Sequence, residues 1–335
     1  MEIRKPYLLF LGDAPDQLAA KTAAGVVDWR LDWCVGQMRL PGCQADVGLE
    51  DLDIAGAAAK GAKTFVIGVV NAGGVLPDHW IDAIVEAIEA GMDVASGLHA
   101  RLGALPRVAE AAKTHGAQLH DVRHSTERFS TGKGVKRPGR RILTVGTDCS
   151  VGKKYAALAL EAEMRARGLD ADFRATGQTG VLIAGRGVAI DAVVADFIAG
   201  AAEWLTPAAA GDHWDVVEGQ GSLFHPSFAG VTLGLLHGSQ PDAFVVCHEP
   251  TRKTMRGVTH PLPSIAEVIE ATVAAGKLTN PEIRCVGIAV NTAALGDAEA
   301  RAVIDKTAAE HRVPTSDPVR FGMAPIVERL IAEFP

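Results

Sequence analysis

The segment ILTVGTDCSVGKK, residues 142–154, leads from an apolar, β-branched run into a turn framed by Gly146 and Gly152. The alanine- and leucine-rich residues 155–163 that follow have the pattern of a helix. A strand, a glycine-rich loop and a helix in this order form a phosphate cradle, because N–H groups of the loop and of the first helical turn converge on an anion. Lys153 adds a positive charge to this cradle. A turn that only joins strand to helix is the alternative. We therefore predict that the phosphates of a ligand are bound by Gly146, Thr147, Asp148, Cys149, Ser150, Val151, Gly152, Lys153 and Lys154.

Lys154 departs from the usual nucleotide-binding loop. That loop has Ser or Thr after the lysine, and its hydroxyl binds the Mg²⁺ that accompanies ATP or GTP. An ammonium group cannot ligate a metal ion and repels one. We therefore predict a phosphate-bearing ligand that arrives without a metal, and coenzyme A, with its pyrophosphate and 3′-phosphate, is such a ligand.

Composition limits the class of protein. The 335 residues are enough for two domains, and 48% hydrophobic with 22% charged residues is ordinary for a soluble globular chain. The net charge of −7 disfavours nucleic acid as a partner, and no run approaches the roughly 18 apolar residues of a membrane span. The N-terminus lacks a signal-peptide pattern, and the five cysteines are scattered, without the paired spacings of zinc or disulfide frameworks. We expect a cytoplasmic protein with a small-molecule substrate.

The first third of the chain alternates between two patterns. Strand-like runs at 6–12, 64–70 and 92–95 are separated by helical patterns, clearest at 80–88. Alternating strands and helices predict right-handed crossovers and a parallel sheet. The first strand is not followed by the Gly-x-Gly-x-x-Gly that admits a dinucleotide pyrophosphate. We predict a Rossmann-like domain that shapes a pocket or an oligomer contact and does not bind NAD.

Residues 125–141 separate this domain from the phosphate loop. They mix Ser, Thr, Gly and Pro with basic residues and lack apolar periodicity, which favours a solvent-exposed linker. The prediction is therefore an α/β protein with a Rossmann-like parallel-sheet domain at 1–124, a linker at 125–140 and a P-loop NTPase-like parallel-sheet domain at 141–335.

Polar residues recur where the strands of the second predicted domain end. In an open α/β sheet this edge binds ligands. We therefore expect a crevice around Lys153 that is lined by Gln178, Glu218, His248, Arg252 and Asn291.

Four motifs in combination resemble a known family. They are GTDCSVGK at 146–153, DAVVADF at 191–197, EGQGS at 218–222 followed by His225-Pro226, and HEPTR at 248–252. Together they resemble two-domain bacterial and archaeal proteins that were long catalogued as a domain of unknown function and include the D-glutamate N-acetyltransferases. The resemblance spans essentially the whole chain. The loop and the Glu-Gly-x-Gly strand end are also similar to dethiobiotin synthetase.

The resemblance implies transfer of acetyl from acetyl-CoA to the amine of D-glutamate, or of a similar amino acid, in D-amino-acid catabolism. A homo-oligomer is also expected. An amino acid arrives as an ammonium, so a base must accept a proton. Glu218 and His248 are the catalytic candidates, with a structural ion pair and a structural histidine as the alternatives. Backbone N–H groups of 219–222 are candidates for the oxyanion contact.

D-Glutamate has two carboxylates, which arginine binds in bidentate geometry. Each candidate arginine has a salt bridge within the fold as its alternative. A covalent acetyl-cysteine at Cys149 is a weaker option, because direct transfer needs no thiol. The substrate-binding residues that we predict are Gln178, Gln220, His225, Arg252, Arg174 and Arg123.

Other functions compete with acetyl transfer. The main alternative is an ATP- and Mg²⁺-dependent ligase or small-molecule kinase similar to dethiobiotin synthetase, against which Lys154 argues. A sensor that binds acyl-CoA or a nucleotide without turnover is another. Hydride transfer is disfavoured by the missing dinucleotide fingerprint.

Overall fold

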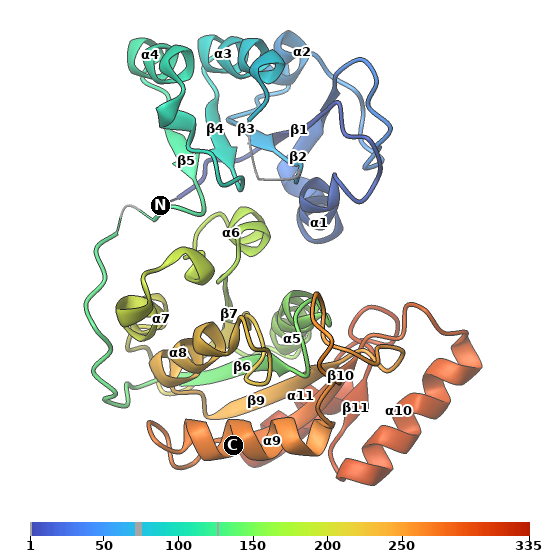
Figure 1. Cartoon of the computed structure of the whole chain (residues 1–335). Helices are drawn as coiled ribbons and strands as arrows, with labels where there is room; N and C mark the ends of the chain where they lie inside the picture. Colours follow the sequence, from blue (N-terminus) through green and yellow to red (C-terminus); the bar gives the residue numbers. More distant parts are fainter. Residues whose placement is uncertain (1, 71–75, 126) are drawn as a thin grey trace. The chain divides into compact units, whose positions relative to one another are not determined.

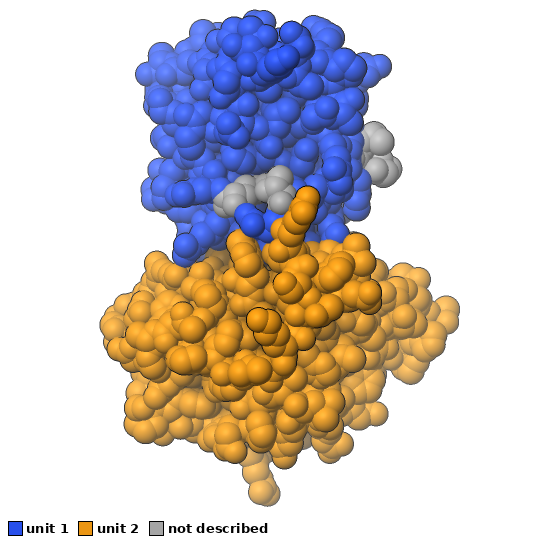
Figure 2. All heavy atoms as spheres, turned by 90° about the vertical axis from the view of Figure 1, so that its left-hand side faces the viewer, with its two compact units in different colours: residues 1–127, 177–192 blue, residues 128–176, 193–335 orange. Residues whose placement is uncertain are grey.

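The computed structural model describes residues 2–70, 76–125 and 127–335. The chain forms two compact units, which Figure 2 colours separately: unit 1 contains residues 1–127 and 177–192, and unit 2 contains 128–176 and 193–335. Unit 1 thus takes a segment from inside the predicted P-loop domain. Among the described residues, no helix is both long and apolar enough to span a membrane.

Unit 1 is built on a five-stranded, all-parallel sheet in the order β2-β1-β3-β4-β5. Its strands are β1 (Tyr7–Gly12), β2 (Cys34–Arg39), β3 (Thr64–Ile67), β4 (Asp93–Ser96) and β5 (Leu119–Asp121). Its helices are α1 (Lys21–Arg30), α2 (Ile54–Ala59), α3 (Ile81–Glu89), α4 (Pro106–His115) and α6 (Gln178–Ala184). Helices α2, α3 and α4 lie on one side of the sheet, and α1 and α6 on the other (Figure 1).

Helix α6 comes from the inserted segment and packs against α1. Gly177 is its N-cap, and Gly185 ends it with a φ of 72°. The composition of residues 176–180, TGQTG, predicts a glycine-rich turn at the end of a strand. This prediction is wrong from Gln178 on, because the apolar residues Val181, Leu182 and Ile183 are fully buried and the segment is helical. The backbone of Ile3 also donates to the carbonyl of Gly185 at 2.9 Å, which fastens the segment to unit 1.

Unit 2 carries a six-stranded, all-parallel sheet in the order β11-β10-β9-β6-β8-β7. Its strands are β6 (Arg140–Gly146), β7 (Ala171–Arg174), β8 (Trp214–Val217), β9 (Ala243–His248), β10 (Arg284–Val290) and β11 (Thr315–Ser316). Its helices are α5 (Lys153–Ala166), α7 (Ile198–Leu205), α8 (Ala229–Ser239), α9 (Ile265–Gly276), α10 (Asp297–His311) and α11 (Ala324–Glu333). Strand β6 lies between β8 and β9, where the strand order reverses, and this is where ligands bind in open α/β sheets (Figure 1).

The alanine- and valine-rich residues 191–203 predict one helix, and this prediction is wrong in its first half. Two short 3₁₀ turns, Ile190–Ala192 and Ala195–Phe197, precede α7. The chain passes from unit 1 to unit 2 after Ala192, so a continuous helix does not form there.

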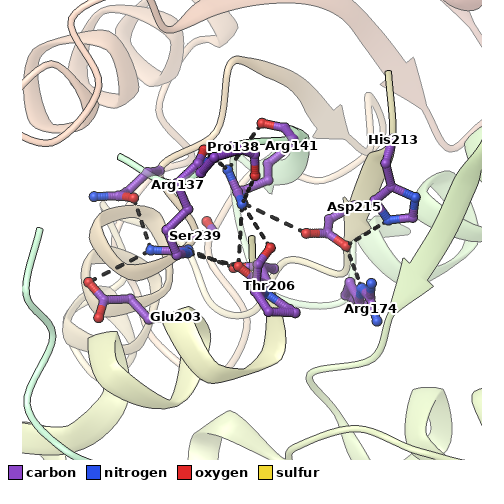
Figure 3. A network of polar contacts seen from close by, with 12 residues as sticks. Arg137, Pro138, Arg141, Arg174, Glu203, Thr206, His213, Asp215 and Ser239 are labelled. Carbon is purple, nitrogen blue, oxygen red and sulfur yellow. Dashed lines mark hydrogen bonds and ion pairs between the residues drawn. The ribbon is translucent and has the colours of Figure 1, made fainter. Parts of the chain in front are cut away.

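The end of the predicted linker is not exposed. Arg141 has no solvent exposure and donates to the carbonyls of Arg137 at 3.0 Å, Pro138 at 2.9 Å and Pro207 at 3.0 Å. Its Nε lies 3.7 Å from the carboxylate of Asp215 (Figure 3). Turn carbonyls that would otherwise be buried without donors are satisfied in this way, so the arginine is part of the interior.

Candidate functional site

The phosphate loop occupies residues 147–152, between the end of β6 and the first residue of α5. Ser150 and Gly152 have φ of 55° and 104°, in the left-handed region that lets the chain reverse tightly. Helix α5 has 14 residues, and its N-terminus presents a partial positive charge to the loop. The geometry is that of an anion-binding turn.

Lys153 is the buried cation of this turn. Lys153 is 7% exposed, and its Nζ donates to the carbonyl of Asp148 at 2.6 Å. Burial lowers the pKa of Lys153 from its ordinary value. An anion on the loop would restore the charged form, so the lysine is suited to a negatively charged ligand.

Asp148 organises the loop from inside. It is fully buried and accepts hydrogen bonds from the N–H groups of Cys149 and Arg256, both at 2.7 Å. Arg252 Nη1 donates to its Oδ2 at 2.8 Å. Burial opposes ionisation of Asp148, but the hydrogen bonds, with that from Arg252 foremost, outweigh it and lower the pKa of the carboxyl.

Arg252, which we predicted to bind a substrate carboxylate, forms hydrogen bonds with the phosphate loop. Besides Asp148 it donates to the carbonyl of Cys149 at 2.6 Å and to that of Ser150 at 3.3 Å, and it pairs with Glu249. These contacts engage both terminal nitrogens of the guanidinium.

Arg256 is a loop contact that the sequence did not reveal. Its exposed guanidinium donates to Ser150 Oγ at 2.6 Å. Its backbone is held on both sides by buried side chains, because its N–H bonds Asp148 and its carbonyl lies 3.0 Å from His225 Nε2. The one signal in the sequence is its place in a basic stretch after β9. His225, a predicted substrate residue, thus positions Arg256.

Glu218 lies at the end of β8 and is 3% exposed. Its Oε2 accepts from the N–H of Thr176 at 2.9 Å, and its carbonyl accepts from the Thr176 hydroxyl at 2.6 Å. Gln220 also donates to that hydroxyl, at 3.2 Å. At the next position, a Cβ on Gly219 would lie 1.6 Å from the carbonyl oxygen of Thr144, so only glycine fits.

His248 contacts the loop from the end of β9. Its Nδ1 lies 3.1 Å from the hydroxyl of Thr147. Burial lowers the pKa of His248, which favours the neutral ring near pH 7.

Three other predicted substrate residues, Arg174, Gln178 and Arg123, lie elsewhere in the fold. Arg174 donates to the buried carboxylate of Asp215 (Figure 3). Gln178 and Arg123 belong to unit 1, where Arg123 pairs with Asp191 at 2.7 Å. The structure therefore brings Gln220, His225 and Arg252 around the loop, but it does not bring all six residues together in one unit.

Among the described residues, one group has the spacing of metal ligands: atoms of Asp148, Cys149 and His225 lie within 4.8 Å of one another. A metal ion there would have to displace the Arg252 guanidinium from Asp148. Burial also raises the pKa of Cys149, which disfavours the thiolate that metal binding or an acetyl-cysteine needs.

A pocket of about 230 Å³ adjoins the loop within unit 2. Gly152 and Tyr155 form its side at α5, while Asn291 and Asp317 line it from the ends of β10 and β11. Lys154 Nζ lies 4.9 Å from the centre of the Tyr155 ring. A ligand with phosphates on the loop has room here for a flat ring.

Family comparisons agree with this arrangement. A Rossmann-like domain of unknown function, DUF1611_N, matches residues 38–125, and a P-loop domain of unknown function, DUF1611_C, matches residues 128–327. This chain belongs to the DUF1611 family. The order of the DUF1611 domains confirms the predicted fold class, a Rossmann-like domain followed by a P-loop domain.

Two relatives of this chain carry a functional name. Proteins of Pseudoalteromonas sp and Tritonibacter scottomollicae, both named D-glutamate N-acetyltransferase, are 52% identical to this chain over 331 residues. The alignments cover 98% of this chain and 100% and 99% of the two relatives. The crystal structure of a DUF1611 family protein from Anabaena variabilis ATCC 29413 matches with a TM-score of 0.86 at 30% identity, over 98% of this chain and 100% of that one.

Proposed function

We propose that this protein is an N-acetyltransferase that moves the acetyl group of acetyl-CoA to the amine of D-glutamate. The observation that carries the proposal is the 52% identity, over 98% of the chain, to two proteins named D-glutamate N-acetyltransferase. Identity of this extent spans both units and the phosphate loop.

The loop and its neighbouring pocket support acetyl-CoA as the donor. The pyrophosphate would lie on the loop, where Lys153 and the N-terminus of α5 supply positive charge. The adenine would occupy the pocket of about 230 Å³ beside Tyr155. Arg256, held over Ser150, would supply a second cation to the phosphates. Lys154 stands where a magnesium-binding hydroxyl would be needed for ATP.

The proposal is tested by following thiol release from acetyl-CoA with D-glutamate, L-glutamate and a panel of other D-amino acids. We expect release that depends on D-glutamate and that matches the amount of N-acetylated product. Absence of release across the panel would contradict the proposal. Mg²⁺-dependent consumption of ATP in the same assays would support the ligase or kinase alternative instead.

A further inference from the structure

The pocket beside the phosphate loop lies entirely within unit 2. It is lined mostly by apolar residues, among them Val290, Ala293 and Pro318, and its volume is about 230 Å³. Ligand pockets commonly have this composition, in which a few polar groups on apolar walls fix the orientation of the ligand and select it. The specificity of this pocket therefore depends on its polar side chains.

The two loops that form one wall of the pocket are fixed to each other. Strands β10 and β11 pair in parallel, so the loops that follow them start at the same edge of the sheet. Asp317 is 2% exposed, and its Oδ2 accepts from the N–H and the hydroxyl of Thr292 at 2.9 and 2.6 Å. Its Oδ1 accepts from the N–H groups of Val319 at 2.9 Å and Arg320 at 3.1 Å. These four bonds hold the wall in place without a ligand.

Arg320 belongs to the same network. Its Nη1 donates to the carbonyls of Thr292 and Leu295, both at 3.0 Å, and its Nη2 pairs with Asp297. The two charged residues that line the pocket, Asp317 and Arg320, thus have opposite signs and are both engaged by the protein. A wall with compensated charges favours a neutral group of the ligand, and a purine base is neutral.

Asn291 is a polar side chain of this pocket with hydrogen-bonding capacity left. It follows β10, and a Cβ added to Gly152 would lie 4.0 Å from the Cβ of Asn291, which places the side chain beside the last glycine of the phosphate loop. Its Oδ1 accepts from the N–H of Ala293 at 3.1 Å. Its Nδ2 makes no hydrogen bond to any residue that the structure describes.

The contact with Ala293 also fixes which way the amide of Asn291 faces. A backbone N–H donates to the amide oxygen and not to the amide nitrogen, so a reversed amide would set two donors against each other. An amide oxygen has two lone pairs, and Ala293 uses one of them. Asn291 therefore offers one acceptor and one donor in a fixed order.

Adenine has the complementary pair of groups. Its 6-amino group is a donor and the neighbouring ring nitrogen is an acceptor, which is why asparagine binds adenine with two hydrogen bonds. Guanine has an oxygen at position 6. In the position that pairs adenine, this oxygen would face the Oδ1 of Asn291, and an amide held by Ala293 cannot rotate to relieve the contact.

We propose that Asn291 selects the adenine base of the acyl donor, with Oδ1 accepting from the 6-amino group and Nδ2 donating to a ring nitrogen. The inference rests on the proposed function for the identity of the ligand, since coenzyme A contains adenine. The phosphate loop binds phosphates whatever base they carry. Selection of the base therefore belongs to the pocket.

The test measures binding of the 3′,5′-bisphosphates of adenosine, guanosine and inosine to the full chain, by calorimetry in the presence of EDTA. The three ligands have the same phosphates and differ only in the base. We expect the wild type to bind the adenosine compound about ten- to hundredfold more tightly than the guanosine compound, which is the discrimination of one bidentate pair. The inosine compound has the oxygen at position 6 but lacks the amino group of guanine, and it should bind as weakly as the guanosine compound.

Two variants assign this preference to Asn291. Asn291→Asp keeps an oxygen for the N–H of Ala293 and replaces only the donor by an acceptor, whereas Asn291→Leu removes both groups. In each variant the ratio of adenosine to guanosine affinity should fall toward one. The ratio cancels any effect of the substitution on the phosphates, which both ligands share.

Tyr155→Leu is the matched control in another wall of the same pocket. An aromatic ring stacks on the face of any base, so its loss should weaken the adenosine and guanosine compounds alike and leave their ratio unchanged. A change of the ratio in Tyr155→Leu as large as that in Asn291→Leu would contradict the assignment to Asn291.

Four other outcomes would overturn the inference. They are equal binding of the adenosine and guanosine compounds by the wild type, binding of the inosine compound as tight as that of the adenosine compound, an unchanged ratio in both Asn291 variants, and no binding of any of the three ligands. The proposed function fails on a different result, namely no thiol release by the wild type. Base selection without acetyl transfer would remove the function and leave the role of Asn291 standing.

Discussion

Lys153 and Asp148 are charged residues with 7% and 0% exposure, side by side in the phosphate loop. Buried charges are costly unless they are paired and hydrogen-bonded. Asp148 meets this condition through Arg252 and two backbone N–H groups. Lys153 donates to the neutral carbonyl of Asp148, and a bound anion would add the negative charge that a carbonyl does not carry.

Acetyl-CoA affinity should therefore depend on the protonation of Lys153. Burial lowers the pKa of Lys153 from its ordinary value, so as pH rises the ammonium loses its proton earlier than an ordinary lysine does. We expect the affinity to fall by about ten- to hundredfold across this pH range, since a charge-assisted hydrogen bond contributes about 1.5–3 kcal/mol. Calorimetric titrations from pH 7 upward measure this change.

The matched variant for this measurement is Lys153→Arg. A guanidinium stays charged over the whole range, so the variant should bind with little dependence on pH. An equal fall in affinity for both proteins would show that Lys153 does not carry the effect.

At the residue scale, the sequence was enough to predict the position of Lys153 in the phosphate loop but not the contact of Arg256 with that loop. Glycine spacing and the order of strand, loop and helix identify Lys153 without a structure. Arg256 has no such signal, because its contact with Ser150 depends on a chain reversal after β9, in which Thr254 pairs with Pro261. A long-range contact of a loop arginine leaves no local pattern.

At the scale of elements, apolar runs predicted the central strands well. The predicted runs at 6–12 and 64–70 correspond to β1 and β3, and the apolar run that leads into Gly146 corresponds to β6. Strand β2 was missed because CVGQMR mixes polar residues and glycine and lies at the sheet edge, where burial is partial. Helix α6 was missed because its bounding glycines suggest a turn, while its burial comes from α1, which is remote in sequence.

The entry of the chain into β6 depends on the buried guanidinium of Arg141. Arg141→Met keeps an unbranched apolar side chain but removes the guanidinium, which leaves several carbonyls and part of Asp215 without this partner. We expect the free energy of unfolding to fall by about 2–4 kcal/mol, measured by urea denaturation. Asp215 keeps Arg174 as a partner in this variant, so we expect a smaller loss of stability than if Asp215 had no partner left.

Arg329→Met is the control on the surface of the same unit. Arg329 is exposed on α11 and pairs with Glu333 one turn away, so its loss should change stability by less than about 1 kcal/mol. Equal effects of the two substitutions would contradict a structural role for the buried arginine.

At the scale of the whole molecule, the chain forms two α/β units. Residues 177–192 belong to unit 1, although the chain on both sides of them belongs to unit 2. The sequence predicted two parallel-sheet domains, since alternating strand and helix patterns determine that class. It did not predict that residues 177–192 pack with unit 1, because partner choice by a short helix depends on tertiary contacts and not on its own periodicity. The segment carries Gln178 and Asp191 to the edge of the unit 1 sheet where Arg123 lies.

The most direct measurement of the central claim is calorimetric binding of acetyl-CoA in the presence of EDTA, with the wild type and Lys153→Ala. The account predicts tight binding by the wild type without any metal, weakened at least tenfold in the variant, with ATP a poor competitor. Binding that appears only when Mg²⁺ is added, or that is the same in both proteins, would contradict a metal-free phosphate loop built around Lys153.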